Sequence, residues 1–582
     1  MISETYSQLI KHFPAQYSPR PIQDQILIKI AEGLDQGKHT ILLDAGTGVG
    51  KSAIAVTLSN YFDSAYIVTV TKQLQDQYQS DFGFQVLKGR NNWDCRAAPQ
   101  DEDKPRKAKC DDGLCQVRSA DYKCAYGVTN SDIKEDFIAF TDSHGKIWSY
   151  RTSAPCSYWD QKSTAINSNI TLMNYASFFP EINYLPHFSD RVLNVFDEAH
   201  NLDDQIMQQM SINLSNQQFN RDSERVESEL EKLGSENDLS PVELGDLLAK
   251  IPRIPRLTSM DYTEDVDHIL TLLTELQKSY NGLASLSDLS TKTKKHLTSM
   301  ALKLDTGIKE LEEHPHEWII DPNSTHEKIR IKPIEVNRFC GKYFFDHSNY
   351  NLLMSATILD KGCFSKWHGL NPDDVIYIHV KSPFKKKHRP IIIDTAGPMS
   401  NKYIETTKPL TIPKVQRILE KHKNEKGLIH THNHKLAVYL YDTLKDPRIM
   451  IYSFNGRRGP RREDVIKKFM ESEEPKVLVA PSVDEGIDLP GDLCRFQIIY
   501  KVPFPYLGDK QIMARKKKDP DWYAYKTVTS LVQAYGRGMR NEDDHCHTYI
   551  MDGSIDGVLT QEWMKCRKFL PEYFVEAIQF AR

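Results

Sequence analysis

The sequence predicts an α/β protein built from two parallel-sheet lobes, the first of which is interrupted by two insertions. Three observations lead to this prediction. Short apolar runs alternate with helical stretches in both halves of the chain, a pattern typical of parallel sheets. A polar, cysteine-bearing stretch and then a charged, helical stretch interrupt the first half. A chain of 582 residues is also too long for one compact core, which favours several domains.

The first lobe has three strand-like apolar runs, at residues 40–44, 65–70 and 192–196. The first run ends at a glycine-rich loop that leads into a helical stretch at 52–61, and the third ends at Asp197. Functional side chains of open α/β sheets lie at the carboxyl ends of the strands. The pattern therefore predicts a parallel sheet with sites at these two strand ends.

The first insertion is predicted between residues 88 and 155. This stretch is polar, contains cysteines and lacks apolar periodicity, as expected of a small domain placed in a loop. Residues 137–150 alternate in polarity around His144 and Gly145, which predicts a β-hairpin.

The second insertion is predicted from about residue 204 to 316, where the sequence becomes helical and strongly charged. Ser240 to Glu243 form a capping box with proline at the first helical position. Leucines at helical spacing follow within 268–283. We expect an all-helical insertion that is either a solvated stalk without chemistry or an element that contacts substrate.

The second lobe is predicted to begin near residue 390. Strand-like runs first return at 352–354 and 375–380, and further runs follow at 427–430, 477–480 and 497–502. The expected domains are the first lobe at 1–88, 161–204 and 336–390, the cysteine domain at 89–160, the helical insertion at 205–335 and the second lobe at 391–582.

Composition sets few limits on the partner. The net charge of −4 neither supports nor excludes nucleic acid, because an acidic domain can mask a basic face in the total. Residues 1–14 lack the apolar core of a signal peptide, and no run is long enough to span a membrane. We expect a soluble protein of a bacterial or viral-host cytoplasm rather than of a nucleus, because the chain is compact and has no long appended tails.

The glycine-rich loop after the first strand has the spacing of a P-loop. Glycines let backbone N–H groups turn toward phosphate oxygens, and the N-terminus of the following helix adds its positive dipole end. Lys51 can reach the β- and γ-phosphates of ATP, and the Ser52 hydroxyl can ligate Mg²⁺. The residues of the loop are Ala45, Gly46, Thr47, Gly48, Val49, Gly50, Lys51 and Ser52.

A second phosphate-transfer motif, Asp197-Glu198-Ala199-His200, follows the third strand. Asp197 is placed to hold Mg²⁺, and Glu198 is placed to orient or deprotonate the attacking water. Four such residues alone are not specific, but the strand before them and the P-loop upstream make a phosphate-transfer site the favoured interpretation.

An arginine-bearing segment, residues 533–540, lies far away in the second lobe. Arg537 and Arg540 are three residues apart, so a helix would place both on one face. Guanidinium donors suit the charge that spreads over a phosphoryl group in transfer. The alternative is an exposed basic helix face. With the loop in one lobe and these arginines in the other, ATP binding would close the cleft and hydrolysis would open it.

Together these motifs resemble those of the iron–sulfur superfamily 2 helicases of the XPD/DinG group, and the resemblance covers nearly the whole chain. The matching segments appear in the family's order, at 17–23 (YSPRPIQ), 71–77 (TKQLQDQ), 174–175 (NY), 355–357 (SAT), 485–491 (EGIDLPG) and 533–540 (QAYGRGMR). Two departures are Asp44, where many members carry glutamate, and residues 430–433 (HTHN), where the family has a serine-bearing version. The second leaves the strand contacts of the second lobe open.

The resemblance implies two RecA-like motor domains with a cluster domain and an arch-like domain inserted in the first. It implies a monomeric motor that hydrolyses ATP with Mg²⁺, translocates on single-stranded DNA and unwinds forked duplexes. The 5′-to-3′ direction comes from the family alone. By resemblance the adenine contact is Gln23, the second-lobe nucleotide contacts are Glu485, Gly486 and Asp488, and the catalytic set is Lys51, Asp197, Glu198, Gln533, Arg537 and Arg540.

Five of the ten cysteines crowd together, at Cys95, Cys110, Cys115, Cys124 and Cys156. Such clustering favours metal ligation over disulfides in an intracellular protein, and four thiolates suit either Zn²⁺ or an iron–sulfur cluster. The alternative is a group of unligated buried cysteines. By resemblance Cys95 and Cys156 are the outer ligands of a 4Fe–4S cluster, with Cys115 and Cys124 between them. Cys110 is the substitute, or a fifth, unligated thiol.

Three basic runs, at 381–389, 457–462 and 515–518, are candidate contacts to a phosphate backbone. Each is alternatively a solvated surface run. Phe384 and Tyr506 lie near these runs and are candidates to stack bases, with packing at the lobe junction as the alternative for Phe384.

Two rival functions remain at the level of sequence. The first is a binding or regulatory module that uses ATP only to switch between clamped and open states. Glu198 and Arg537 argue against it, because a pure switch need not keep the hydrolytic groups. The second is a zinc-stabilised translocase that acts on RNA, or on duplex DNA without separating its strands.

Overall fold

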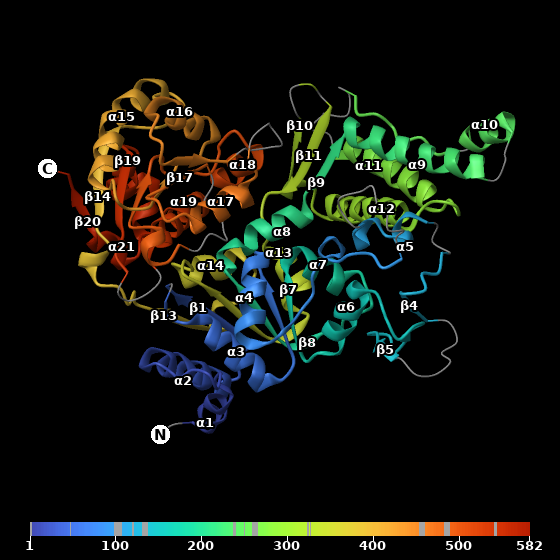
Figure 1. Ribbon diagram of the computed structural model, residues 1–582, viewed down its shortest axis with the longest axis horizontal. Helices are drawn as coiled ribbons and strands as arrows, with labels where there is room; N and C mark the ends of the chain where they lie inside the picture. The colour runs from blue at the N-terminus through green and yellow to red at the C-terminus, as the bar shows by residue number, and fades with distance from the viewer. Residues whose placement is uncertain are drawn as a thin grey trace.

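The computed structural model has two lobes, each built around a seven-stranded sheet, and two inserted modules that extend from the first lobe (Figure 1). Every strand pairing within the two large sheets is parallel. The residues described are 3–46, 48–97, 108–118, 122–130, 138–236, 240–249, 251–258, 266–322, 325, 327–452, 460–481, 489–539 and 544–581.

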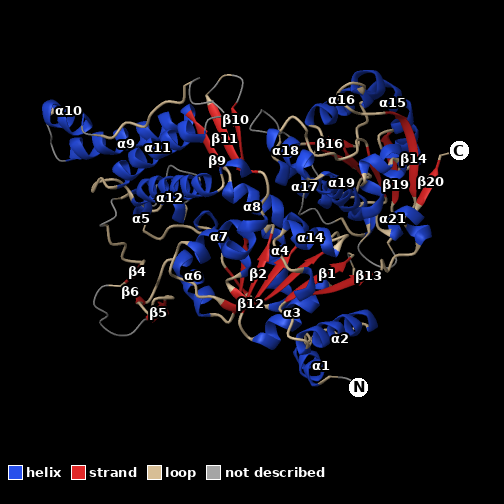
Figure 2. Ribbon diagram, turned by 180° about the vertical axis from the view of Figure 1, so that it is seen from behind, coloured by secondary structure: helices blue, strands red, loops and turns tan. Residues whose placement is uncertain are grey.

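The sheet of the first lobe has the strand order β13-β1-β12-β8-β2-β7-β3. Its central strands are buried and mostly apolar because helices cover both faces of the sheet. This arrangement is visible from the opposite side in Figure 2. The strands are β1 (Thr40–Ala45), β2 (Ala65–Thr69), β3 (Gln85–Val86), β7 (Ile170–Asn174), β8 (Arg191–Asp197), β12 (Ser348–Ser355) and β13 (Val375–Val380).

The helices of the first lobe begin at recognisable sequence signals. Pro21 opens α2 at the first helical position, Thr71 caps α4 through a hydrogen bond to the backbone of Leu74, and Asn174 caps α7. The helices are α1 (Glu4–Leu9), α2 (Pro21–Asp35), α3 (Lys51–Phe62), α4 (Lys72–Phe82), α6 (Ser157–Asn167), α7 (Tyr175–Asn183), α8 (Leu202–Met210), α13 (Asn337–Cys340) and α14 (Lys361–Trp367).

The first insertion contains a small antiparallel sheet in the order β4-β6-β5, together with the short helix α5 (Leu114–Val117). The predicted hairpin is confirmed, although Phe137 lies outside the described residues. Gly145 turns the chain with φ near +74°, and the Asp142 carboxylate accepts the backbone N–H groups of His144 and Lys146. The strands are β4 (Val128–Thr129), β5 (Ile138–Thr141) and β6 (Ile147–Tyr150).

The prediction of an all-helical second insertion is wrong. Its helices α9 (Asn216–Glu236), α10 (Pro241–Ala249), α11 (Val266–Ala284) and α12 (Thr291–Glu313) rest on an antiparallel sheet of β9 (Ile212–Ser215), β10 (Trp318–Pro322) and β11 (Lys328–Pro333). Short strands such as β9 have little local signal, and β9 pairs with β11 from the other end of the insertion. The predicted capping box is confirmed, with Ser240 and Glu243 hydrogen-bonded to each other's backbone.

The second lobe has the strand order β16-β17-β15-β18-β19-β14-β20. The predicted runs at 427–430 and 477–480 are strands, and the run predicted at 497–502 corresponds to β18 at Phe496–Ile499. The remaining strands are β14 (Ile391–Gly397), β15 (Gly427–His430), β16 (Ile449–Ile451), β17 (Val477–Ala480), β19 (His547–Asp552) and β20 (Ile578–Phe580). The helices are α15 (Ile404–Lys421), α16 (His434–Leu444), α17 (Arg462–Glu471), α18 (Lys510–Lys518), α19 (Pro520–Tyr535), α20 (Ile555–Thr560) and α21 (Glu572–Glu576).

The two lobes meet through α19, which is buried along most of its length. The ring of Tyr525 lies edge-on to Trp367 of the first lobe with centroids 4.8 Å apart, and its hydroxyl donates to the carbonyl of Ile358 at 2.9 Å. This apolar contact continues the core of the first lobe into the second. Among the described residues no helix is both long and apolar enough to cross a membrane.

Candidate active site between the lobes

The P-loop joins β1 to α3 at the carboxyl edge of the first sheet. Gly48 and Gly50 have φ values of +81° and +85°, which glycine adopts without steric penalty. A Cβ on Gly50 would lie 2.3 Å from Nε2 of Gln23, so this position also requires glycine for space. The Lys51 ammonium donates to the carbonyl of Ala45 at 3.0 Å, which folds it back over the loop. Thr47 lies outside the described residues.

Gln23 braces the P-loop from the N-terminus of α2, a role that sequence reasoning missed. Its side chain is only 4% exposed. Its Oε1 accepts the backbone N–H of Arg20 at 2.9 Å, and its Nε2 donates to the carbonyl of Val49 at 3.1 Å. Arg20 adds a hydrogen bond to the carbonyl of Gly48 at 2.7 Å. The shape of the loop therefore depends on this amide, whose contact with adenine stays a prediction.

Asp197 ends β8 beside the P-loop and is 5% exposed. One of its oxygens accepts the hydroxyl of Tyr78 at 3.1 Å, and the other accepts the backbone N–H of Glu198 at 2.9 Å. Tyr78 also bonds Ser52, so one buried hydroxyl bridges the two predicted Mg²⁺ ligands. Burial, followed by the charge of Glu198, raises the pKa of Asp197 to about 6 against the opposing effect of Lys51.

Glu198 has a left-handed backbone conformation with φ of +53°, which is uncommon for a residue other than glycine and is typical of functional sites. Its carboxylate lies 3.2 Å from Nδ1 of His200. Burial opposes ionisation, but the adjacent His200 ring, together with the charges of Lys51 and Arg537, holds the pKa of Glu198 well below its usual range. The carboxylate is therefore ionised beside the P-loop.

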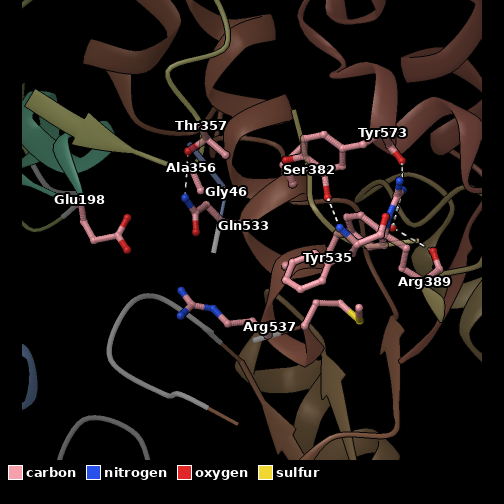
Figure 3. Close-up of a pocket in the computed structure, with 14 residues that line it drawn as sticks. Gly46, Glu198, Ala356, Thr357, Ser382, Arg389, Gln533, Tyr535, Arg537 and Tyr573 are labelled. Atoms are coloured by element: carbon pink, nitrogen blue, oxygen red, sulfur yellow. Dashed lines mark hydrogen bonds between the residues drawn. The ribbon is translucent and has the colours of Figure 1, made fainter. Parts of the chain in front are cut away.

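His200 joins this site to the second lobe. Its Nδ1 lies 2.8 Å from the hydroxyl of Ser355 and 3.3 Å from Nε2 of Gln533. Gln533, on α19, also donates to the hydroxyl of Thr357 at 2.8 Å (Figure 3). Three segments that are far apart in the sequence thus share one hydrogen-bond network across the lobe boundary.

Arg537 lies beyond the end of α19, in a 3-10 turn at Gly536–Gly538. The prediction that Arg537 lies on a helix is therefore wrong, because the helix ends at Tyr535, before the two glycines. Arg537 lines the same cavity as Gly46 and Glu198 (Figure 3). The structure thus brings together Lys51, Ser52, Asp197, Glu198, Gln533 and Arg537, whereas Arg540, Glu485, Gly486 and Asp488 lie outside the described residues.

Asp44 precedes the P-loop, at the position where many family members carry glutamate, and its carboxylate has several hydrogen-bond partners within the protein. Its carboxylate is 4% exposed and accepts the Tyr377 hydroxyl at 3.1 Å, His379 Nδ1 at 2.9 Å and the backbone N–H of Ile358 at 3.2 Å. The hydrogen bond to Asp44, opposed by burial, raises the pKa of His379. Asp44 therefore ties the edge strand β13 and the turn after β12 to the strand that carries the P-loop.

The five clustered cysteines gather in the first insertion. Cys110 and Cys156 are buried together with Cys95 packed against them, and Cys115 shares a hydrogen bond with Cys124. This hydrogen bond lowers the pKa of Cys115 to about 5 against the opposing effect of burial. Within the described part of the chain, no three or more Cys, His, Asp or Glu side chains form a group that could hold a metal ion.

Two cations face the cysteines. Arg90 Nη1 lies 4.0 Å from the sulfur of Cys115, and Lys295 of α12 interacts electrostatically with the same thiol. Lys292, one turn earlier on α12, pairs with Asp111 at 3.1 Å and Asp112 at 2.8 Å. The two insertions are thus joined beside the thiols, and Arg90 and Lys295 place positive charge next to the Cys115 sulfur.

The basic run at 515–518 is largely occupied by contacts within the protein. Arg515 is fully buried, Lys516 lies 4.4 Å from the ring centre of Tyr523, and Lys518 pairs with Glu335. The candidate phosphate contact at 515–518 is therefore wrong for Arg515, because burial and an ion pair remove it from solvent. Phe384 is buried, as its alternative at the lobe junction predicted, and Tyr506 is 69% exposed. Residues 457–459 lie outside the described residues.

Fold and site define a two-lobed P-loop nucleotide hydrolase whose active site is shared between the lobes. Comparisons with known proteins agree. The family profile described as "Type III restriction enzyme, res subunit" matches residues 16–221, and "Helicase C-terminal domain" matches 415–567. The chain is 20% identical to the ATP-dependent DNA helicase YoaA of Escherichia coli, over 94% of this chain and 93% of that protein.

A second curated relative and two solved structures also match the chain. The 3′-5′ exonuclease DinG of Bacillus subtilis is 25% identical over 50% of this chain, and the aligned part spans 35% of that protein. A solved XPD helicase superposes with a TM-score of 0.59 at 15% identity, and S. tokodaii Xpd4 with 0.56 at 14%. Each structural match covers 97% of this chain and 100% of the other, and at these identities shows the fold alone. The chain belongs to the XPD/DinG-type superfamily 2 DNA helicases.

Replacing Gln533 with alanine should slow ATP hydrolysis and leave ATP binding intact. The substitution removes the hydrogen bonds to His200 and Thr357 without touching the P-loop, and loss of about 1.4 kcal/mol of such interaction lowers kcat about tenfold. Steady-state hydrolysis and equilibrium binding of a fluorescent ATP analogue measure the two effects. Gln36→Ala, at an exposed position after α2, is the control and should match the wild type. Unchanged kcat in Gln533→Ala would contradict the prediction.

Proposed function

We propose that this protein is an ATP-dependent DNA helicase that translocates on single-stranded DNA from 5′ to 3′ and unwinds duplex DNA. The observation that carries the proposal is the composite site, in which His200 and Thr357 of one lobe bond Gln533 of the other beside the P-loop. A site divided in this way makes the relative position of the lobes depend on the nucleotide. Cycles of binding and hydrolysis then move the lobes against each other.

Within this site the residues have separate roles. Lys51 binds the β- and γ-phosphates, and Gln23 holds the loop and contacts adenine. Ser52 and Asp197, joined through Tyr78, would hold Mg²⁺, which neutralises phosphate charge when bound. Glu198, held ionised by its cationic neighbours, orients the attacking water, and Arg537 stabilises charge on the transferred phosphoryl group. Arg540, Glu485, Gly486 and Asp488 complete the nucleotide contacts in the proposal.

DNA as the track and the 5′-to-3′ direction rest on resemblance to the family. The name of the YoaA relative, which aligns over 94% of this chain, supports DNA unwinding driven by ATP. The exonuclease activity named for the B. subtilis relative is not part of the proposal, because the alignment spans only 35% of that protein. The motor acts as a monomer on single-stranded and forked DNA.

We also infer a 4Fe–4S cluster in the first insertion, held by Cys95, Cys115, Cys124 and Cys156, with Cys110 as the substitute ligand. The cluster would supply a rigid anionic centre, and the residues around it are suited to that charge. Arg90 and Lys295 face the thiols, while Lys292 fastens α12 to Asp111 and Asp112. Its role would be to brace the small domain beside the path of the strand.

Forked duplexes with either a 5′ or a 3′ single-stranded tail test the proposed function. With ATP and Mg²⁺ under anaerobic conditions, the wild type should separate the 5′-tailed fork and release strands of full length. Lys51→Ala should lose ATP hydrolysis and unwinding together, because the ammonium reaches both outer phosphates. Unwinding by Lys51→Ala would contradict the motor. Preference for the 3′ tail would contradict the direction, and shortened strands would indicate nuclease action.

Single cysteine-to-serine variants identify the ligands. Freshly purified wild type should show visible absorbance with iron and sulfide in equal amounts, and Cys95→Ser, Cys115→Ser, Cys124→Ser and Cys156→Ser should each lose it. Cys110→Ser is the matched control, because it removes a buried thiol from the same group, and it should keep the cluster. Loss in Cys110→Ser with retention in Cys115→Ser would exchange the two assignments. Zinc without visible absorbance would contradict the cluster.

A further inference from the structure

The helix that follows the Asp197-Glu198-Ala199-His200 motif (the DEAH box) is bonded directly to the second lobe. Helix α8 begins at Leu202, two residues after His200, and its first turn contains Asp203 and Asp204. Arg515 of α18 donates from one nitrogen to both oxygens of Asp203, at 2.8 and 2.9 Å. Lys526 of α19 donates to Asp204 at 2.7 Å. The segment that carries the catalytic carboxylate thus ends in two ion pairs across the lobe boundary.

The Asp203–Arg515 pair is fully enclosed. Arg515 is 0% exposed and Asp203 is 4% exposed, and the guanidinium lies 4.2 Å from the ring centre of Trp522. Nε and Nη2 of Arg515 are buried and make no hydrogen bond to any described residue. A buried pair with unsatisfied donors contributes little net stability, because desolvation offsets the attraction between the charges. Its distinctive property is geometric, since the pair is favourable only at one relative position of the two helices.

That position sets the register of α19 against the DEAH box. Lys526 and Gln533 are seven residues apart, so they share one face of α19. Lys526 contacts Asp204, and Gln533 contacts His200 and Thr357. Arg537 follows one turn later. Arg515 belongs to α18, which packs on α19 through Trp522 and fixes the start of the helix.

We propose that Asp203 and Arg515 form a positioning ion pair about which the second lobe pivots, and that this pair, acting through α19, sets where Arg537 lies relative to Glu198. The inference rests on the proposed function, because it assigns the pair a purpose in ATP hydrolysis. Asp203 and Arg515 act through α19 and are positioning residues in this proposal. An apolar contact in their place would let α19 slide along α8.

A double-mutant cycle tests whether Arg515 acts through Arg537. Arg515→Met, which keeps the bulk of the side chain, should lower kcat for DNA-stimulated ATP hydrolysis at least about tenfold with little change in KM for ATP. Arg537→Ala should lower kcat by itself. In the Arg537→Ala background, Arg515→Met should add less than about a twofold loss, because the group that it positions is already absent. Lys366→Met is the matched control, because it removes an inter-lobe ion pair with Asp519 on a side chain that is 65% exposed, and it should keep the kcat of the wild type.

The outcomes separate the inference from the proposed function. An unchanged kcat in Arg537→Ala would overturn the role of Arg537 in hydrolysis, and the positioning pair with it. A strong effect of Arg537→Ala combined with fully multiplicative losses in the double variant would overturn the positioning pair alone. Thermal melting of each variant shows whether it is folded. Arg515→Lys keeps the charge, and it should show the same non-additivity in weaker form. If both Arg515 variants fail to fold, the pair serves folding and the inference is overturned.

Discussion

The hydrogen-bond network around His200 is the interaction on which the rest of the structure depends. The imidazole contacts Glu198 and Ser355 within the first lobe and Gln533 of the second, so one side chain joins the Glu198 carboxylate, the turn after β12 and α19. The P-loop is independent of this network, because Gln23 and Arg20 hold it from α2. Nucleotide binding and lobe placement are therefore built from different contacts, and they meet at one cavity, which Gly46 of the P-loop lines together with Glu198, Gln533 and Arg537.

Much of this site could be predicted from the sequence because its parts are local. The P-loop needs glycines that accept positive φ, and the spacing that shows them is contiguous. Asp197 follows an apolar run, and a parallel strand that is buried on both faces has a strong apolar signal. The strands at 375–380, 427–430 and 477–480 were predictable for the same reason. The assignment to the XPD/DinG group, confirmed by the comparisons, rested on the order of such local motifs.

The remainder depends on contacts between distant segments. Tyr78 bridges Ser52 and Asp197, but nothing in a polar helix such as α4 marks one tyrosine as a partner of a carboxylate far along the chain. In the sheet β10-β11-β9, strands from the two ends of the second insertion pair with each other. These strands have four to six residues, too few to show a clear alternation of apolar and polar residues in the sequence. The basic run at 515–518 predicts an exposed Arg515, and only the structure shows that this side chain is buried against Asp203. The spacing of Arg537 and Arg540 predicts a helix, but α19 ends at Tyr535 and Arg537 lies in the 3-10 turn between Gly536 and Gly538.

In the proposed function one nucleotide site, shared by the two lobes, sets their relative position. Fluorophores attached through non-natural amino acids at Glu32 of α2 and Glu420 of α15 report the distance between the lobes without disturbing the native cysteines. We expect ATP with Mg²⁺ to shift the wild type to a second inter-lobe distance, and Arg537→Ala to bind ATP without this shift. The same distance distribution with and without ATP in the wild type would contradict it.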